Sequence, residues 1–318
     1  MNKKVIPKII KHSITHDWLH VFMVASPVLA ILSRMVIDYY KLKKENILIV
    51  KMRDTSLEIF NHDFIEINPK KIDRYKEKLF FDSPAGREIS NKIRKIDKNF
   101  LVYTGGAWKE VNWLLKDSLS KGHFYIEEGQ ASYRKMKTYD FKKINFWETL
   151  KSNLKNRKLP SDGIGFYFRN DFEGCIGMGK GAFPEIEESK KYILDNFNDV
   201  KCYYKPKIIG SITLGLTSSA SRHPLKSDWE EMLLKLINNL PHGALIKPHP
   251  SFTCNKKVEI EFKEIFYRVN NKDIKLCGSD VMIEFEMIHE KKILFGPQSS
   301  LSIYAEMLGS KYNSISLF

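Results

Sequence analysis

The sequence predicts an α/β protein made of two doubly wound domains that face a central cleft. Short apolar runs that end in Pro, Gly, Ser or Thr alternate with segments whose apolar residues recur at helical spacing, and this alternation is typical of parallel sheets. The rhythm occurs twice, and a basic connecting stretch without a clear pattern separates the two occurrences. We therefore expect an N-terminal domain at residues 1–158 and a C-terminal domain at residues 159–318.

The first domain is expected to open with a strand, a helix and a second strand. The apolar run His20–Ser26 predicts the first strand, and Ser26 before Pro27 is a typical start for a helix at Val28–Lys44. The apolar run Asn46–Val50 then predicts the second strand. The other elements expected here are charged helices within Lys70–Lys98, strands at Phe100–Tyr103 and His123–Ile126, and a helix at Trp108–Leu119.

The second domain is expected to repeat this order after a Gly-rich, aromatic segment at Gly163–Gly181. Apolar residues on one face predict the helix Asp228–Leu240, and the run Ala244–Ile246 predicts the strand that follows it. The remaining elements expected here are helices at Glu185–Phe197, Val258–Val269, Val281–His289 and Leu301–Leu308, and strands at Ser211–Leu216, Asp273–Cys277 and Lys292–Phe295.

The composition limits the classes of protein to consider. The chain of 318 residues carries 52 Lys and Arg against 38 Asp and Glu, and its net charge of +14 indicates an anionic partner: a membrane surface, nucleic acid or a phosphorylated substrate. The basic residues are spread out and form no nucleic-acid motif, so we expect no nucleic-acid partner; a polyanion-binding protein without catalysis is the alternative. The four cysteines are scattered, which argues against a zinc site or disulfides. No apolar run reaches the roughly 20 residues that span a membrane, and together these two observations predict a cytoplasmic protein. Peripheral contact with the anionic inner membrane is a hypothesis from the charge.

The stretch Lys247-Pro248-His249-Pro250 is the strongest candidate for a functional site. It follows a predicted strand, and Pro250 keeps His249 out of the helical region. Ligands of open α/β sheets bind at the carboxyl ends of strands. Lys247 adds a permanent charge beside a histidine that can titrate near neutral pH. A turn with a surface histidine is the alternative.

Other polar residues also follow predicted strands. Glu127 and Glu128 precede Gly129, and one of the two carboxylates is expected to face the cleft as a general base, with an exposed turn as the alternative. Hydroxyls and free backbone N–H groups at a helix N-terminus can bind an anion, although a plain helix cap is the simpler interpretation of each motif taken alone. The residues of this kind are Thr217, Ser218, Ser219, Ser299 and Ser300.

Two further carboxylates lie in an apolar segment. Glu284 and Glu286 could accept hydrogen bonds from a ribose diol, or could form the polar face of an ordinary helix. The segment Gly174–Lys180 satisfies the phosphate-loop pattern G-x-x-x-x-G-K, but Gly181 stands where that loop needs Ser or Thr for Mg²⁺. We therefore interpret the segment as a flexible Gly-rich loop. A P-loop phosphotransferase is the alternative.

The order Glu127-Glu128-Gly129, His249-Pro250 and Ser299-Ser300, each at a strand end, resembles the bacterial sialyltransferases of the GT-B type. This group includes polysialyltransferases and lipooligosaccharide sialyltransferases, and the Ser26-Pro27 turn resembles its opening. The resemblance implies a GT-B fold of two Rossmann-like domains. It also implies inverting transfer of sialic acid, or a related nonulosonic acid, from its CMP-activated donor to a glycan hydroxyl without a metal. A role in capsule or lipopolysaccharide biosynthesis, with a lipid-linked acceptor, would follow.

The resemblance also assigns roles to residues. Glu127 matches the general base, and His249 matches the residue that binds the phosphate and assists its departure as an acid. The residues matched to the nucleotide site are Lys247, Pro248, Thr217, Ser299 and Ser300, with Glu284 for the ribose and Glu286 as its competitor. Both acidic positions of the first motif hold Glu where Asp is familiar, which leaves the donor open, with CMP-Kdo as the alternative.

Overall fold

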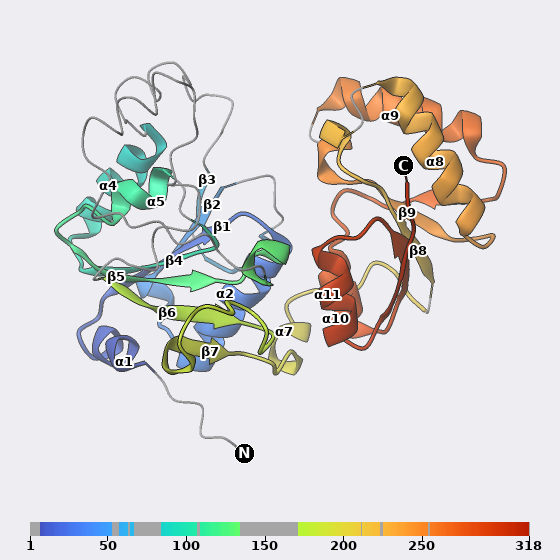
Figure 1. Ribbon diagram of the computed structural model, residues 1–318. Helices are drawn as coiled ribbons and strands as arrows, with labels where there is room; N and C mark the ends of the chain where they lie inside the picture. Colours follow the sequence, from blue (N-terminus) through green and yellow to red (C-terminus); the bar gives the residue numbers. More distant parts are fainter. Residues whose placement is uncertain are drawn as a thin grey trace. The chain divides into compact units, whose positions relative to one another are not determined.

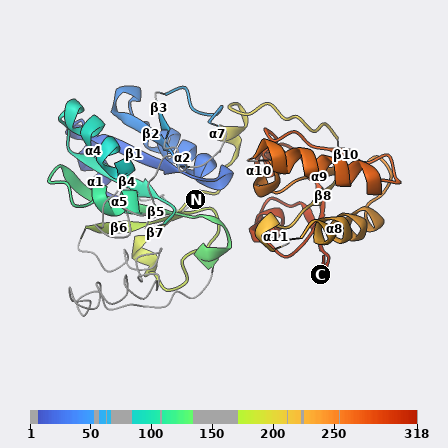
Figure 2. The ribbon, with the colours of Figure 1, turned by 90° about the horizontal axis from the view of Figure 1, so that it is seen from above.

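The chain folds into two compact units in a computed structural model (Figures 1 and 2). The N-terminal unit is Met1–Val200 and the C-terminal unit is Lys201–Phe318. The structure describes residues 7–52, 57–62, 64–66, 84–106, 109–133, 171–210, 212–222, 225–253 and 255–317. Each unit is described by itself below.

The N-terminal unit contains a seven-stranded parallel sheet in the order β3-β2-β1-β4-β5-β6-β7. Strand β1 lies inside the sheet, with Phe22 opposite Ile49 of β2 on one side and Tyr103 of β4 on the other. Every residue of β1 is buried, as expected for a parallel strand that is covered on both faces. The strands are β1 (Leu19–Val24), β2 (Ile47–Lys51), β3 (Phe64–Glu66), β4 (Phe100–Thr104), β5 (Ser120–Ile126), β6 (Phe172–Gly177) and β7 (Lys191–Ile193).

Helices cover both faces of this sheet. Alternate residues of β1, such as Val21 and Met23, pack with Ile89 and Leu114, so α4 (Pro84–Ile96) and α5 (Lys109–Leu114) cover one face. Figure 1 shows α2 (Pro27–Tyr40) on the opposite face. The remaining helices of the described part are α1 (Lys8–Thr15), α7 (Asn198–Lys201) and the 3-10 helices η1 (Lys44–Asn46), η3 (Gly129–Tyr133) and η6 (Glu188–Lys190).

The start of α2 follows from two residues of the sequence. Ser26 is extended, and its hydroxyl accepts a hydrogen bond from the Leu29 N–H at 3.3 Å. Pro27 occupies the first helical position, where its missing N–H costs nothing. The turn predicted after the first strand is therefore confirmed.

The C-terminal unit contains a five-stranded parallel sheet in the order β10-β9-β8-β11-β12. Leu214 of the central strand β8 lies opposite Leu245 of β9 and Leu294 of β11. Numbered within each unit, both sheets share the order 3-2-1-4-5 of Rossmann-like domains. The strands are β8 (Thr213–Leu216), β9 (Leu245–Lys247), β10 (Lys275–Leu276), β11 (Ile293–Gly296) and β12 (Lys311–Ser314).

The helices of this unit form two pairs, shown on either side of the sheet in Figure 1. Leu236 and Phe266 belong to the core that joins the first pair to Ile246 of β9. The first pair is α8 (Lys226–Asn239) and α9 (Lys256–Val269), and the second is α10 (Ile283–His289) and α11 (Ser300–Met307). Two 3-10 helices, η7 (Ala220–Arg222) and η8 (Pro250–Phe252), follow β8 and β9.

Two features of the described residues differ from the expected elements. Strand β6 pairs with β5 and β7 pairs with β6, which completes the first sheet, and the division between the units follows Val200. The expected boundary at residues 158/159 lies outside the described residues. The helix expected at Glu185–Phe197 is replaced by η6 and β7, because this segment pairs with Cys175–Gly177 of β6 and completes the edge of the sheet.

A buried histidine makes the stability of the N-terminal unit depend on pH. His20 is 1% exposed, and its Nδ1 lies 2.9 Å from the Tyr103 hydroxyl. Burial lowers the pKa of His20 from 6.5 to about 4. The unfolded chain therefore takes up a proton that the folded chain does not, so stability is lost as the pH falls from 6.5 towards 4.

We expect the unfolding free energy to drop by about 3 kcal/mol more in the native chain than in His20→Gln over this range, since one pKa unit corresponds to about 1.4 kcal/mol. Denaturant titrations of both chains between pH 7 and pH 4 measure the difference. Parallel pH profiles for the two chains would contradict the role of His20.

Candidate functional site

The candidate site lies where the strand order of the C-terminal sheet reverses. Strands β8 and β11 are neighbours, and the connections that follow them lead to opposite faces of the sheet. In open α/β sheets this switch point leaves a crevice beyond the carboxyl ends of the strands, where ligands bind. Three predicted site segments follow β8, β9 and β11, so one sheet edge brings them together.

The segments after β8 and β9 are joined by a hydrogen bond. The His249 N–H donates to the Thr217 hydroxyl at 2.7 Å. Thr217 is buried, and Pro248, between the strand and His249, is buried as well. Ser218 is also buried, and its hydroxyl has no hydrogen-bond partner among the described residues. The edge therefore contains one hydroxyl that fixes the backbone and one that is unpaired.

The His249 ring is exposed and held through one nitrogen. Its Nδ1 lies 2.8 Å from the Ser251 hydroxyl and accepts the Ser251 N–H at 3.1 Å. Partial burial, and then the nearby Arg222 charge, lower the pKa of His249 below 6.5. The ring is therefore predominantly neutral at pH 7, and its Nε2 is the nitrogen left for a ligand.

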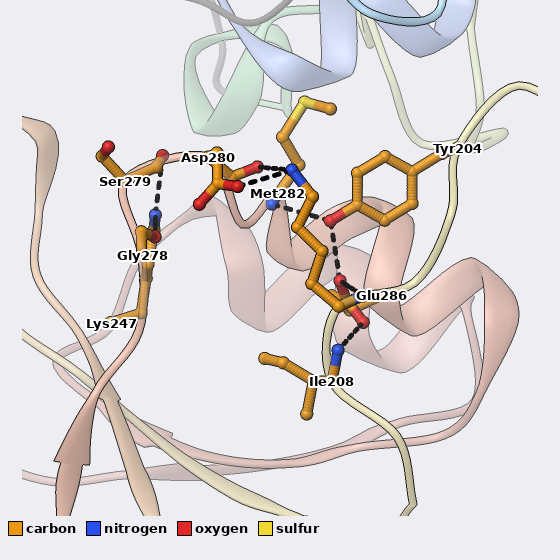
Figure 3. Close-up of polar contacts among 9 residues, drawn as sticks. Tyr204, Ile208, Lys247, Gly278, Ser279, Asp280, Met282 and Glu286 are labelled. Carbon is orange, nitrogen blue, oxygen red and sulfur yellow. Dashed lines mark hydrogen bonds and ion pairs between the residues drawn. The ribbon is translucent and has the colours of Figure 1, made fainter.

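Lys247 ends β9 and holds the neighbouring loop. Its Nζ donates to the backbone carbonyls of Gly278 at 2.7 Å and Ser279 at 3.0 Å, and Figure 3 shows these contacts. Burial lowers the pKa of Lys247, whereas the charges of Asp280 and Glu284 oppose this change. The ammonium group thus fixes the loop after β10 and adds positive charge at the sheet edge.

The serine pair forms the beginning of α11. Ser299 is the N-cap of the helix, without a side-chain cap hydrogen bond, and Ser300 is its first residue. Both are half-buried, and the Ser299 hydroxyl lies 3.4 Å from that of Tyr312. Just before them, a Cβ on Gly296 would lie 2.8 Å from Cβ of Leu216, so only glycine lets β11 approach β8 this closely.

The structure separates Glu284 from Glu286. Both lie on α10, but Glu286 is fully buried and its carboxylate accepts the Tyr204 hydroxyl at 2.7 Å and the Lys207 N–H at 2.9 Å. It also accepts the Ile208 N–H at 3.2 Å (Figure 3). Glu284 is half-buried, and burial raises the pKa of its carboxyl group. Glu286 therefore fixes the segment before β8, and Glu284 remains the residue proposed for a ribose.

Glu127 and Glu128 follow β5 of the N-terminal unit. Glu127 is fully buried, and its carboxylate accepts the Tyr133 hydroxyl at 2.7 Å and the Met178 N–H at 2.8 Å. Glu128 is half-buried, and its Oε2 lies 2.7 Å from where a Cβ of Gly105 would be. Gly105 follows β4, at the switch point between β1 and β4. Glu128 thus lies at that switch point, and Glu127 holds the turn after β6.

The G-x-x-x-x-G-K segment does not have the geometry of a phosphate loop. Gly174 lies within β6, and the exposed Lys180 follows in a turn. Residues 178–186 form turns and bends, and the 3-10 helix η6 follows Glu187. A phosphate loop leads directly into an α-helix, so the P-loop interpretation lacks the helix it requires.

Several residues of this arrangement were not predicted from the sequence. Ser251 holds the histidine ring, Tyr133 holds Glu127, and Tyr204 holds Glu286. Ser251 and Tyr133 lie in short 3-10 helices and Tyr204 lies in a loop, and one sequence contains no signal that marks them. Within the described residues, no helix is long and apolar enough to cross a membrane.

Comparison with solved structures identifies the fold. The alignment with the MnaA–UDP structure of S. aureus covers 94% of this chain and 79% of the S. aureus chain, with a TM-score of 0.56 and 13% sequence identity. The alignment with the UDP-N-acetylglucosamine 2-epimerase of Rickettsia bellii covers 94% of this chain and 79% of the Rickettsia chain, with a TM-score of 0.51 and 12% sequence identity. No protein-family model and no curated protein matches the chain. The expected GT-B fold is confirmed, and at these identities the likeness concerns the fold alone.

The expected sialyltransferase family and CMP-sialic acid reaction are wrong. The similar structures are UDP-N-acetylglucosamine 2-epimerases and other nucleotide-sugar proteins, not CMP-sialyltransferases. The acidic pair, His-Pro and Ser-Ser each follow a strand of a Rossmann-like sheet. Polar residues at such positions fit any nucleotide-sugar fold of this type, so their order does not specify cytidylate.

Proposed function

We propose that the chain is an enzyme that acts on a nucleotide sugar, and that the C-terminal unit binds the nucleoside diphosphate at the switch point between β8 and β11. The observation that carries the proposal is the convergence of three features at one sheet edge: the His249 ring, two adjacent serines at the start of α11, and the buried Ser218 hydroxyl, which has no hydrogen-bond partner among the described residues. A fold shared with a UDP-bound protein over nearly the whole chain supports it.

Each group has a chemical role in this proposal. Ser299, Ser300 and the free N–H groups of the first turn of α11 donate hydrogen bonds to phosphate oxygens. His249 donates through Nε2, and Lys247 adds positive charge nearby. Donors fixed in advance stabilise the charge that develops on a departing diphosphate. Glu284 accepts hydrogen bonds from the ribose diol.

The nucleotide is proposed to be uridine diphosphate. The similar S. aureus structure holds UDP, and the similar Rickettsia protein is a UDP-N-acetylglucosamine 2-epimerase. The first donor to test is therefore UDP-N-acetylglucosamine. Release of UDP in the presence of a glycan acceptor would indicate transfer, whereas a change in configuration at C2, followed by NMR, would indicate epimerisation.

Nucleotide binding is the test of this proposal. We expect UDP to raise the melting temperature of the chain more than CMP, GDP or ADP. Replacing Ser299 and Ser300 together with Ala should weaken UDP binding at least tenfold, because hydrogen bonds to charged groups contribute about 1.5–3 kcal/mol each. The matched control is Ser227→Ala, a serine exposed in the first turn of α8, which should bind UDP like the native chain. Equal affinity of the double variant and the control would refute the site.

A further inference from the structure

We infer that Ser251 is a positioning residue that fixes His249 as a neutral imidazole protonated at Nε2, so that the ring presents a hydrogen-bond donor to the ligand. The inference rests on the proposed function only for the identity of that ligand. The state of the ring follows from contacts within the C-terminal unit. It adds to the site a residue that no sequence motif indicated.

The first contact determines which nitrogen accepts. The Ser251 backbone N–H points at Nδ1 of His249 at 3.1 Å. A backbone N–H can only donate, so Nδ1 must present its lone pair. A neutral imidazole carries one proton, and that proton must then be on Nε2.

The second contact supports the same assignment. The Ser251 hydroxyl oxygen accepts the Ala220 N–H at 2.8 Å and lies 2.8 Å from Nδ1. Because the oxygen is already an acceptor from Ala220, its proton can be donated to Nδ1. With Nδ1 unprotonated, as the backbone contact requires, both Ser251 groups can donate to this nitrogen, whereas a proton on Nδ1 would oppose the Ser251 N–H.

The backbone on either side of the ring is fixed as well. His249 is extended, its N–H is bound by Thr217, and Pro250 begins the 3-10 helix η8. Ala220 belongs to η7, after β8, whereas Ser251 belongs to η8, after β9. The Ala220–Ser251–His249 chain of hydrogen bonds therefore joins the two loops at the sheet edge and fixes the direction of Nε2.

The chemical consequence is a defined role for the histidine. An Nε2–H group donates to a phosphate oxygen without first taking up a proton. The same group cannot accept a proton at Nε2, so His249 is not a general base towards a bound ligand. The lowered pKa of His249 agrees with a ring that stays neutral.

NMR of the full chain with ¹⁵N-labelled histidine tests the inference without any ligand. Long-range ¹H–¹⁵N correlations at pH 7.5 distinguish the two neutral tautomers, and His249→Asn identifies the signals of His249. We expect the native ring to be protonated at Nε2. Ser251→Ala keeps the backbone N–H contact at 3.1 Å but loses the hydroxyl contact at 2.8 Å, so we expect it to raise the share of the tautomer protonated at Nδ1. Ser251→Thr should keep the native state. The matched control is Thr253→Ala, which removes another hydroxyl from the same turn, one that bonds to the Pro250 carbonyl.

Protonation of the native ring at Nδ1, or an unchanged tautomer in Ser251→Ala, would overturn the inference. A UDP titration of the same samples separates it from the proposed function. We expect Ser251→Ala to bind UDP about fivefold more weakly, the equivalent of one lost hydrogen bond. If UDP does not bind the native chain while the tautomer follows Ser251 as expected, the proposed nucleotide fails and the inference on Ser251 stands.

Discussion

Changing Glu127 to Gln is expected to lower turnover by a factor of about 10²–10⁴ while UDP binding is retained, since we propose that this carboxylate, which follows β5, is the general base expected from the sequence. The residues proposed to bind the nucleotide belong to the other unit of the chain. Glutamine preserves the shape of the side chain. Its oxygen can accept the Met178 N–H and its amide can donate to the Tyr133 oxygen, so the expected cost in folding stability is about 1 kcal/mol. Initial rates with saturating nucleotide sugar, alongside UDP titrations, measure both effects.

Glu128→Gln is the matched comparison for Glu127→Gln. The two residues are adjacent, but Glu128 is half-buried beside Gly105, whereas both Glu127 oxygens are hydrogen-bonded inside the unit. The expected result is that Glu128→Gln keeps most of the turnover. If instead Glu127→Gln stays fully active and Glu128→Gln does not, the role of base passes to Glu128 at the switch point.

Replacing Glu286 with Ala is expected to destabilise the C-terminal unit by on the order of 4 kcal/mol. The change leaves the Tyr204 hydroxyl and the N–H groups of Lys207 and Ile208 without their acceptor, and each unsatisfied buried donor costs about 1–3 kcal/mol. Denaturant unfolding measures the loss. Hydrogen–deuterium exchange locates it, because the Lys207 and Ile208 amides should lose their protection.

The control is Glu284→Ala on the same helix. Glu284 is half-buried, and within the described part of the chain its carboxylate accepts a hydrogen bond from its own backbone N–H and from no other residue. We expect its removal to leave the unfolding free energy within about 1 kcal/mol of the native value and to weaken UDP binding. Equal destabilisation by both variants would contradict the division of roles between the two carboxylates.

The sequence predicted most of the fold because apolar runs with turn residues after them are strong signals. Strands β1, β2, β4, β5, β8, β9 and β11 lie where such runs were found. Strand β6 was missed because Gly174 and Gly177 made it resemble a loop; these glycines make room for Tyr192 and for the Glu127 carboxylate. Strand β12 (Lys311–Ser314) was missed because it is polar and only partly buried, as edge strands often are.

The sequence predicted which residues belong to the candidate site, but not how the strands bring them together. Lys247, His249, Thr217 and Ser299 were each recognised from a position after a strand. Their convergence depends on the strand order β9-β8-β11, which no local pattern contains. The nucleotide could not be predicted, because the motifs mark strand ends, and the contacts that select a base lie in loops without a sequence signal.

The repeated strand order has a consequence for how the specificity of such a protein evolves. Each sheet has its own reversal of strand order, one between β1 and β4 and one between β8 and β11. The residues around the first are encoded before Val200, and those around the second after it. If the nucleotide binds where we propose, substitutions in the C-terminal third of the chain can change the preferred nucleotide without altering the residues around the first reversal.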